Sequence, residues 1–176
     1  AEAMHREALA LRRRDPAAQI QIADALFNIS TVLAAQGRVA EARPLAHEAI
    51  AIWERELGSQ HPRMLTGLGN LAIMAEVTAD YVEADALATR ALALARALRG
   101  EGHPDVASYS ALLATIDGWR GDFAAARRHF DEALAILASG PARPEKHSDA
   151  LLAAASFHVD ERDLAVLNHY LARAPA

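Results

Sequence analysis

Residues 49–62 read AIAIWERELGSQHP, and residues 91–104 read ALALARALRGEGHP. Gly58 and Gly100 mark the same place in the two copies and lie 42 residues apart. A fixed period of this size is typical of a solenoid, in which each unit buries a face against its neighbour. The repeat therefore predicts a stacked array of similar units.

Each unit is predicted to hold two helices, because apolar residues recur at steps of three and four on both sides of a turn. Glu7–Arg12 resembles Glu48–Trp53, so we expect the chain to begin inside a unit and to be part of a longer protein. Nine helices and no strand pairing are expected in total. The expected division is 1–14 (second helix of a truncated repeat), 15–58, 59–100 and 101–140 (three repeats) and 141–176 (a degenerate capping repeat).

Composition narrows the class of protein. With 176 residues, 52% of them hydrophobic, the chain can bury a substantial core, and a net charge of −5 argues against nucleic-acid binding. The absence of cysteine excludes disulfides and thiolate metal sites. We expect no membrane partner, because no apolar run approaches the roughly 18 residues that a membrane span needs and no signal peptide opens the chain. A cytoplasmic protein is expected on the same two grounds. A bacterial source is expected because arginine predominates among the basic residues and Lys146 is the one lysine.

Small and large residues alternate at the repeat step on the first helices. Ser30, Ala72 and Ala114 lie 42 residues apart, where paired helices must approach closely. Ile29, Leu71 and Leu113 are the matching large residues and are expected in the core. Ala84 on a second helix is also expected to be buried. A larger side chain at such a crossing forces a shift that costs about 1–3 kcal/mol.

A turn residue before an aromatic or aliphatic residue recurs as Gly37-Arg38-Val39, Ala79-Asp80-Tyr81 and Gly121-Asp122-Phe123. Together with the small-residue positions, it resembles the tetratricopeptide repeat. The 42-residue period and the Leu57-Gly58-x-x-His61-Pro62 turn resemble the kinesin-light-chain-like subtype. This likeness implies an all-α fold, a right-handed superhelix of antiparallel helix pairs whose concave face, lined by the first helices, holds a peptide or a partner surface. Asp117, Gly67 and Gly69 depart from the family pattern.

The family's concave positions map onto polar and apolar residues of three first helices. They are Asp24, Asn28, Thr31 and Ala35, then Thr66, Asn70, Ile73 and Val77, then Ser108, Leu112, Thr115 and Trp119. Asn28 and Asn70 would stand side by side as a clamp, because an amide can donate to and accept from a bound backbone; the alternative is that both are solvated surface residues. No Lys or Arg lies among these positions, so a clamp for a terminal carboxylate is not expected. Gly69 stands at the repeat position that Phe27 occupies one unit earlier, and it is expected to leave a dent in the groove wall. The alternative is that this glycine reflects sequence drift without a functional role.

The other sequence motifs do not indicate a nucleotide-binding, metal-binding or catalytic site. The run from Gly67 to Ala72 matches a dinucleotide fingerprint, but no strand precedes it. The eight histidines are dispersed, and no Ser/His/Asp grouping has a catalytic spacing, so we expect no metal, no cofactor and no enzyme activity. The leading hypothesis is a scaffold that binds a protein or peptide. The alternatives are a spacer or homo-oligomer formed through the array ends, and a ligand-sensing domain of a signalling kinase or transcription regulator.

Overall fold

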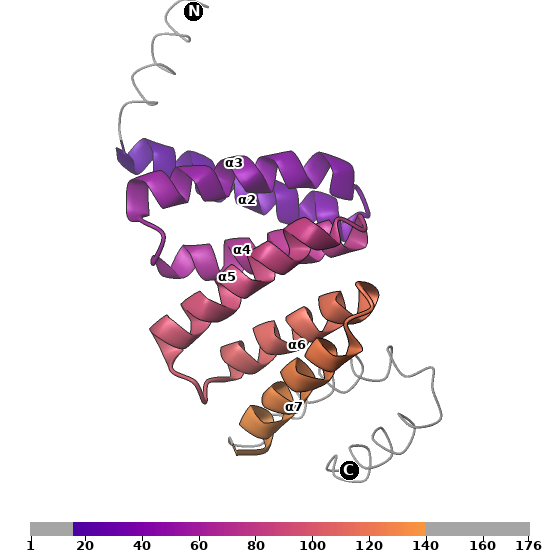
Figure 1. Ribbon diagram of the computed structural model, residues 1–176. Helices are drawn as coiled ribbons and strands as arrows, with labels where there is room; N and C mark the ends of the chain where they lie inside the picture. Colours follow the sequence, from indigo (N-terminus) through magenta and orange to yellow (C-terminus); the bar gives the residue numbers. More distant parts are fainter. Residues whose placement is uncertain (1–15, 140–176) are drawn as a thin grey trace, which may run out of the picture. The chain divides into compact units, whose positions relative to one another are not determined.

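The computed structural model describes residues 16–139 and shows six α-helices and no strand within that range (Figure 1). The helices are α2 (Pro16–Ala35), α3 (Val39–Leu57), α4 (Pro62–Val77), α5 (Tyr81–Arg99), α6 (Pro104–Trp119) and α7 (Phe123–Ser139). The all-α prediction is confirmed. The expected helix of 1–14 and the capping repeat of 141–176 lie outside the described residues.

The chain divides into two compact units, residues 1–80 and residues 81–176. The described part of the N-terminal unit contains α2, α3 and α4, and that of the C-terminal unit contains α5, α6 and α7. The boundary falls between the two helices of the expected repeat 59–100, so the division into repeats stays a prediction.

The repeated Gly-x-x-His-Pro turn both ends one helix and begins the next. Gly58 has a φ of +86°, in the left-handed region where glycine avoids the strain of a side chain. The Nδ1 atom of His61 accepts a hydrogen bond from the backbone N–H of Arg63 at 3.2 Å. His103 does the same for Asp105 at 3.1 Å. A proline follows each histidine at the first helical position, where its missing N–H costs nothing.

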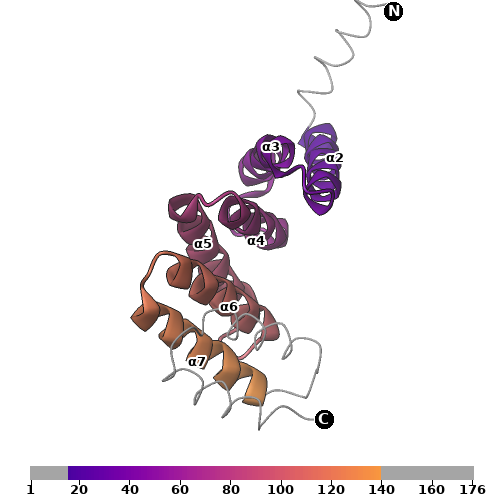
Figure 2. The same ribbon diagram turned by 90° about the vertical axis from the view of Figure 1, so that its right-hand side faces the viewer.

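In the N-terminal unit, α2 and α3 form an antiparallel pair, and α4 packs against α3 (Figures 1 and 2). The buried face of α3 consists of Ala42, Ala46, Ala49, Ile50, Ile52 and Trp53. Gly67 lies in the contact between α4 and α3, where an added Cβ atom would sit 3.0 Å from Ile50 Cγ1 and 3.1 Å from Trp53 Cζ3. Its lack of a side chain therefore allows the two helices to approach closely.

The expectation that Ile29 belongs to the core is wrong for the described structure. Ile29 is 52% exposed, whereas Leu71, at the matching position of α4, is 1% exposed and Leu113 is also buried. The reason is the neighbour that each helix has. α4 packs on α3 and α6 packs on α5, but within residues 16–139 no helix precedes α2.

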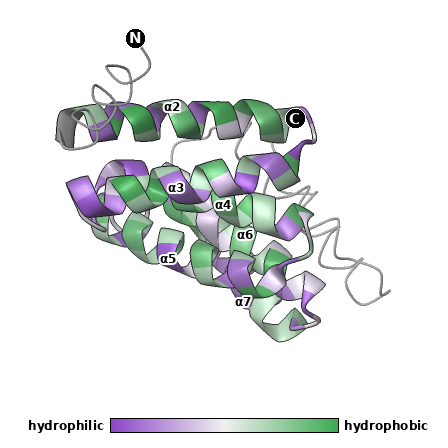
Figure 3. Cartoon of the chain, turned by 90° about the horizontal axis from the view of Figure 1, so that it is seen from above, coloured by the Kyte–Doolittle hydropathy of each residue, from purple (hydrophilic) through white to green (hydrophobic). Residues whose placement is uncertain are grey.

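The apolar character of α2 also corrects the expectation about membrane spans (Figure 3). Residues Ala18–Ala35 form a helix that is long and apolar enough to cross a membrane by length and composition, and 17% of this window is buried. One such helix does not by itself indicate a membrane protein, since core helices of globular proteins meet the same criterion.

The C-terminal unit is built on small residues. Ala84 is fully buried, as expected, and a cluster of Ala107, Ala111, Ala114, Phe130, Ala133 and Leu137 joins α6 to α7.

The small residues that recur at the repeat step are buried in both units. Ser30, Ala72 and Ala114 are all fully buried, which agrees with their assignment to close helix contacts.

Asp117, which departs from the repeat pattern, is buried between α6 and α7 and has a partner. Its Oδ2 atom lies 2.8 Å from Nδ1 of His129 on α7. The hydrogen bond compensates for placing a carboxylate where the repeat pattern expects an apolar residue.

Ser110 and Glu132 form a second polar contact between α6 and α7. The Ser110 hydroxyl donates to Glu132 Oε2 at 2.6 Å, and Glu132 also pairs with Arg96 of α5. Burial raises the pKa of Glu132, but the hydrogen bonds from Ser110 and Arg96, with the charges of Arg96 and His129, outweigh it and hold that pKa below its usual value. Glu132 is therefore a carboxylate that the folded state favours in its ionised form.

Candidate functional site

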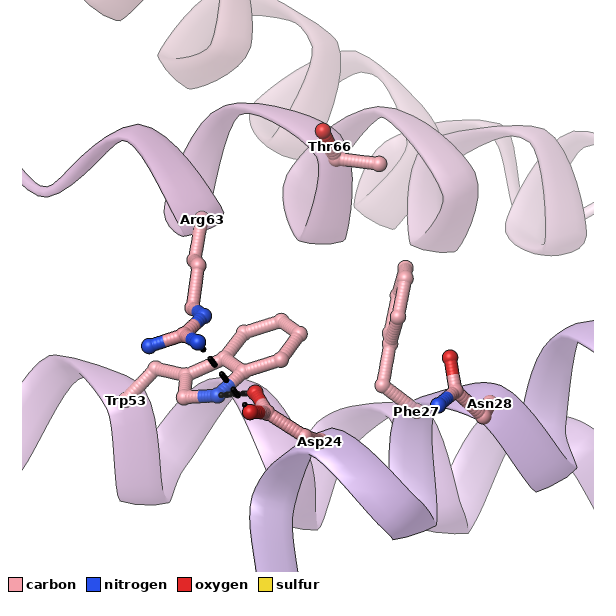
Figure 4. Close-up of a pocket in the computed structure, with 6 residues that line it drawn as sticks. All are labelled: Asp24, Phe27, Asn28, Trp53, Arg63 and Thr66. Atoms are coloured by element: carbon pink, nitrogen blue, oxygen red, sulfur yellow. Dashed lines mark hydrogen bonds and ion pairs between the residues drawn. The ribbon is translucent and has the colours of Figure 1, made fainter. Parts of the chain in front are cut away.

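The N-terminal unit contains a pocket of about 290 Å³ between α2 and α4, with α3 behind it (Figure 4). Its walls are formed by Asp24, Phe27, Asn28, Trp53, Arg63 and Thr66. Asp24, Asn28 and Thr66 belong to the concave positions that the sequence predicted, and the structure brings these three together. Phe27, Trp53 and Arg63 were not predicted as site residues.

Asp24 joins the three helices of the unit. Its Oδ1 atom accepts a hydrogen bond from Trp53 Nε1–H at 3.0 Å, and its Oδ2 atom accepts one from Arg63 Nη2 at 3.1 Å (Figure 4). Trp53 is 3% exposed, so its indole N–H would be left without a partner if the carboxylate were removed. Asp24 thus holds the pocket walls in place.

Arg63 places a cation beside the groove, although no Lys or Arg lies among the predicted concave positions. It lies in the first turn of α4, outside the predicted row, and its long side chain reaches Asp24 of α2. The bond to Asp24 uses Nη2, and among the described residues Nε and Nη1 have no hydrogen-bond partner. Because one carboxylate and one guanidinium are paired, the pocket carries no net charge.

Two aromatic rings form the apolar part of the wall. The ring centroids of Phe27 and Trp53 lie 5.0 Å apart at an interplanar angle of 56°. Phe27 stands beside Asn28 and points toward α4 (Figure 4). Gly69, the position of α4 that matches Phe27, is buried, and the dent expected there stays a prediction.

The polar residues of the predicted groove differ in how their side chains are used. Thr31, Ser108 and Thr115 bond their hydroxyls to backbone carbonyls one turn earlier in their own helices, at 3.0, 3.0 and 3.1 Å. By contrast, the side chains of Asn28, Thr66 and Asn70 have no hydrogen-bond partner within residues 16–139. The groups available to a ligand therefore gather in the N-terminal unit.

The remaining predicted positions lie outside the pocket. Ile73 and Val77 are exposed on the C-terminal half of α4. In the C-terminal unit, Ser108 is exposed, Leu112 and Thr115 are half-buried, and the exposed ring of Trp119 stacks on Tyr81 with centroids 6.4 Å apart.

In the C-terminal unit, the buried Ser110 and Asp117 lie near the half-buried His129 without forming a nucleophile and base. The Ser110 hydroxyl lies near Glu132 and the backbone carbonyl of His129, and the imidazole of His129 faces Asp117. Nucleophile activation needs a hydrogen bond from the hydroxyl to the imidazole.

Comparison with known proteins assigns the family. Residues 64–139 match a tetratricopeptide repeat, and residues 22–63 match a second description of the same repeat. The chain belongs to the tetratricopeptide repeat family. Repeats of this family are protein-interaction scaffolds and are generally not catalytic, so the chain has the architecture of a scaffold. None of the curated proteins matches the chain.

Solved structures confirm the fold expected from the kinesin-light-chain-like turn. The crystal structure of BtubC (BKLC) from P. vanneervenii aligns with a TM-score of 0.79 at 22% identity, over 99% of this chain and 70% of that one. Nearly identical TPR-like repeats of the kinesin light chain type from Podosopora anserina align with a TM-score of 0.63 at 24% identity, over 89% of this chain and 74% of theirs. A variant of those repeats gives a TM-score of 0.64 at 24% identity, over 89% and 73%.

Proposed function

We propose that the chain binds an extended segment of a partner protein in the groove of the N-terminal unit, where α2 and α4 meet. The observation that carries this proposal is the pocket at Phe27, in which the side chains of Asn28 and Thr66 have no partner within residues 16–139. A cytoplasmic, bacterial setting is a further part of the proposal and rests on composition.

The chemistry of an extended peptide fits these groups. Such a segment presents unpaired backbone N–H and C=O groups, and an asparagine amide can donate to one and accept from the other. Asn28 and Asn70 occupy matching positions on two neighbouring first helices, and Thr66 lies one turn before Asn70. Because these contacts address the backbone, they would hold segments of varied sequence.

Panning a phage-displayed library of random dodecapeptides on the wild-type chain would supply ligands for the test. The double variant Asn28→Ala/Asn70→Ala should bind the selected peptides about 5- to 150-fold more weakly, since each lost hydrogen bond is worth about 0.5–1.5 kcal/mol. Folding should be unchanged by circular dichroism, because neither amide has a partner in the described structure.

Gln60→Ala is the matched control, because its exposed amide lies in the turn before α4 and outside the pocket. Peptides that bind the double variant and the wild type equally well would contradict the proposed groove.

A further inference from the structure

The concave row of α4 changes character along its length. Thr66, Asn70, Ile73 and Val77 follow one another at steps of four, three and four, so they share one face of the helix. The first two are polar and have no partner in the described part of the chain. The last two are apolar and exposed, Ile73 by 48% and Val77 by 66%. A polar half of the row is therefore followed by an apolar half.

The matching row of α2 shows the same division. α2 and α4 run parallel, because both are antiparallel to α3, and they touch each other directly (Figures 1 and 2). Asp24 and Asn28 lie in the first half of this row. In the second half, the hydroxyl of Thr31 is bonded to the Phe27 carbonyl, and Ala35 is small and exposed. The C-terminal half of this groove thus offers apolar surface and no hydrogen-bonding side chain that is without a partner.

The charges of the groove constrain its occupant. Asp24 and Arg63 neutralise each other across the pocket at 3.1 Å, and the other concave positions of α2 and α4 carry no charge. A ligand with a cluster of like charges would gain no complementary partner here. Exposed aliphatic side chains beside hydrogen-bonding groups instead favour a segment that is itself uncharged and partly apolar.

We infer that the N-terminal unit selects an uncharged peptide segment with a bulky aliphatic side chain that packs on Ile73 and Val77. The backbone of the same segment is held by Asn28, Thr66 and Asn70, so this inference rests on the proposed function. From Asn70 to Val77 the helix rises about 10 Å. An extended chain covers that distance in about three residues, so the aliphatic side chain follows or precedes the clamped peptide group by about three positions.

The test uses the same random dodecapeptide library with a second double variant, Ile73→Ser/Val77→Ser. Peptides selected on the wild type should share one bulky aliphatic position and should bind this variant about tenfold or more weakly, because the variant removes the apolar contact. Val82→Ser is the control, since Val82 is a strongly exposed valine on α5 in the other unit.

The outcomes separate this inference from the proposed function. If the selected peptides depend on Asn28 and Asn70 but bind the serine variant undiminished, the inference is wrong and the groove stands. The inference is also wrong if those peptides are dominated by acidic or basic residues. If binding depends on neither pair, both the inference and the proposed groove fail.

Discussion

Removal of the Asp24 carboxylate tests how the pocket is held together. Asp24 accepts hydrogen bonds from Trp53 of α3 and Arg63 of α4, so Asp24→Ala breaks both contacts at once. Asp24→Asn is the matched variant, because its amide oxygen can still accept from the indole N–H while the charge that Arg63 faces is lost. The pair of variants separates the buried hydrogen bond from the surface ion pair.

The two contacts differ in expected magnitude. Leaving the buried Trp53 N–H without an acceptor costs about 1–3 kcal/mol. The Arg63 and Asp24 side chains are 42% and 36% exposed, and an ion pair of that kind contributes about 0–1 kcal/mol. Alanine recovers a few tenths of a kcal/mol in helix propensity. Asp24→Ala should therefore lower the free energy of unfolding by about 1–3 kcal/mol, and Asp24→Asn by less than about 1 kcal/mol.

Urea denaturation followed by circular dichroism measures both values. Trp53→Phe removes the donor, so combining it with Asp24→Ala closes a double-mutant cycle for the same hydrogen bond. The cycle should return a coupling energy of at least about 0.5 kcal/mol. Equal midpoints for Asp24→Ala and Asp24→Asn, or a coupling energy near zero, would refute the assignment of Asp24 as the residue that holds the pocket walls.

Two further predictions address the helix contacts. Gly67→Ala should destabilise the fold by about 1–3 kcal/mol despite better helix propensity, because its Cβ would press on Ile50 and Trp53. Gly102→Ala is the control, because a Cβ atom there would meet open space, and it should not measurably change the free energy of unfolding in the same urea assay. If both variants changed that free energy equally, α4 would be able to shift without strain. Since folding lowers the pKa of Glu132, its ionised side chain stabilises the fold above the usual carboxyl pKa near 4.3, and this contribution is lost as the pH falls through the folded-state pKa. The melting temperature of Glu132→Gln should consequently change less than that of the wild type between neutral pH and about pH 3, and parallel curves would contradict this role.

Much of the fold could be predicted because the repeat specifies local structure twice. Apolar spacing determines which face of a helix is buried, and the Gly-x-x-His-Pro turn supplies a left-handed glycine, a histidine cap and a first-turn proline in consecutive units. These are short-range effects, so they can be recognised without knowing what each helix touches. Asp24, Asn28 and Thr66 were predicted together on another basis, because the resemblance to the tetratricopeptide repeat implies which positions of the first helices line the concave face.

The remaining features depend on which surfaces meet. Arg63 and Trp53 line the pocket although neither belongs to the predicted concave rows. The long side chain of Arg63 reaches in from the first turn of α4, and the ring of Trp53 comes from the second helix α3. Ile29 has the same place in its repeat as Leu71 but is exposed, whereas Leu71 is buried in α4, which packs on α3. Gly67 departs from the helix pattern because α3 lies too close for a side chain. Periodicity along the chain determined the helices and their faces, whereas burial, ion pairing and the pocket were decided by contacts between residues far apart in the chain, which local spacing does not encode.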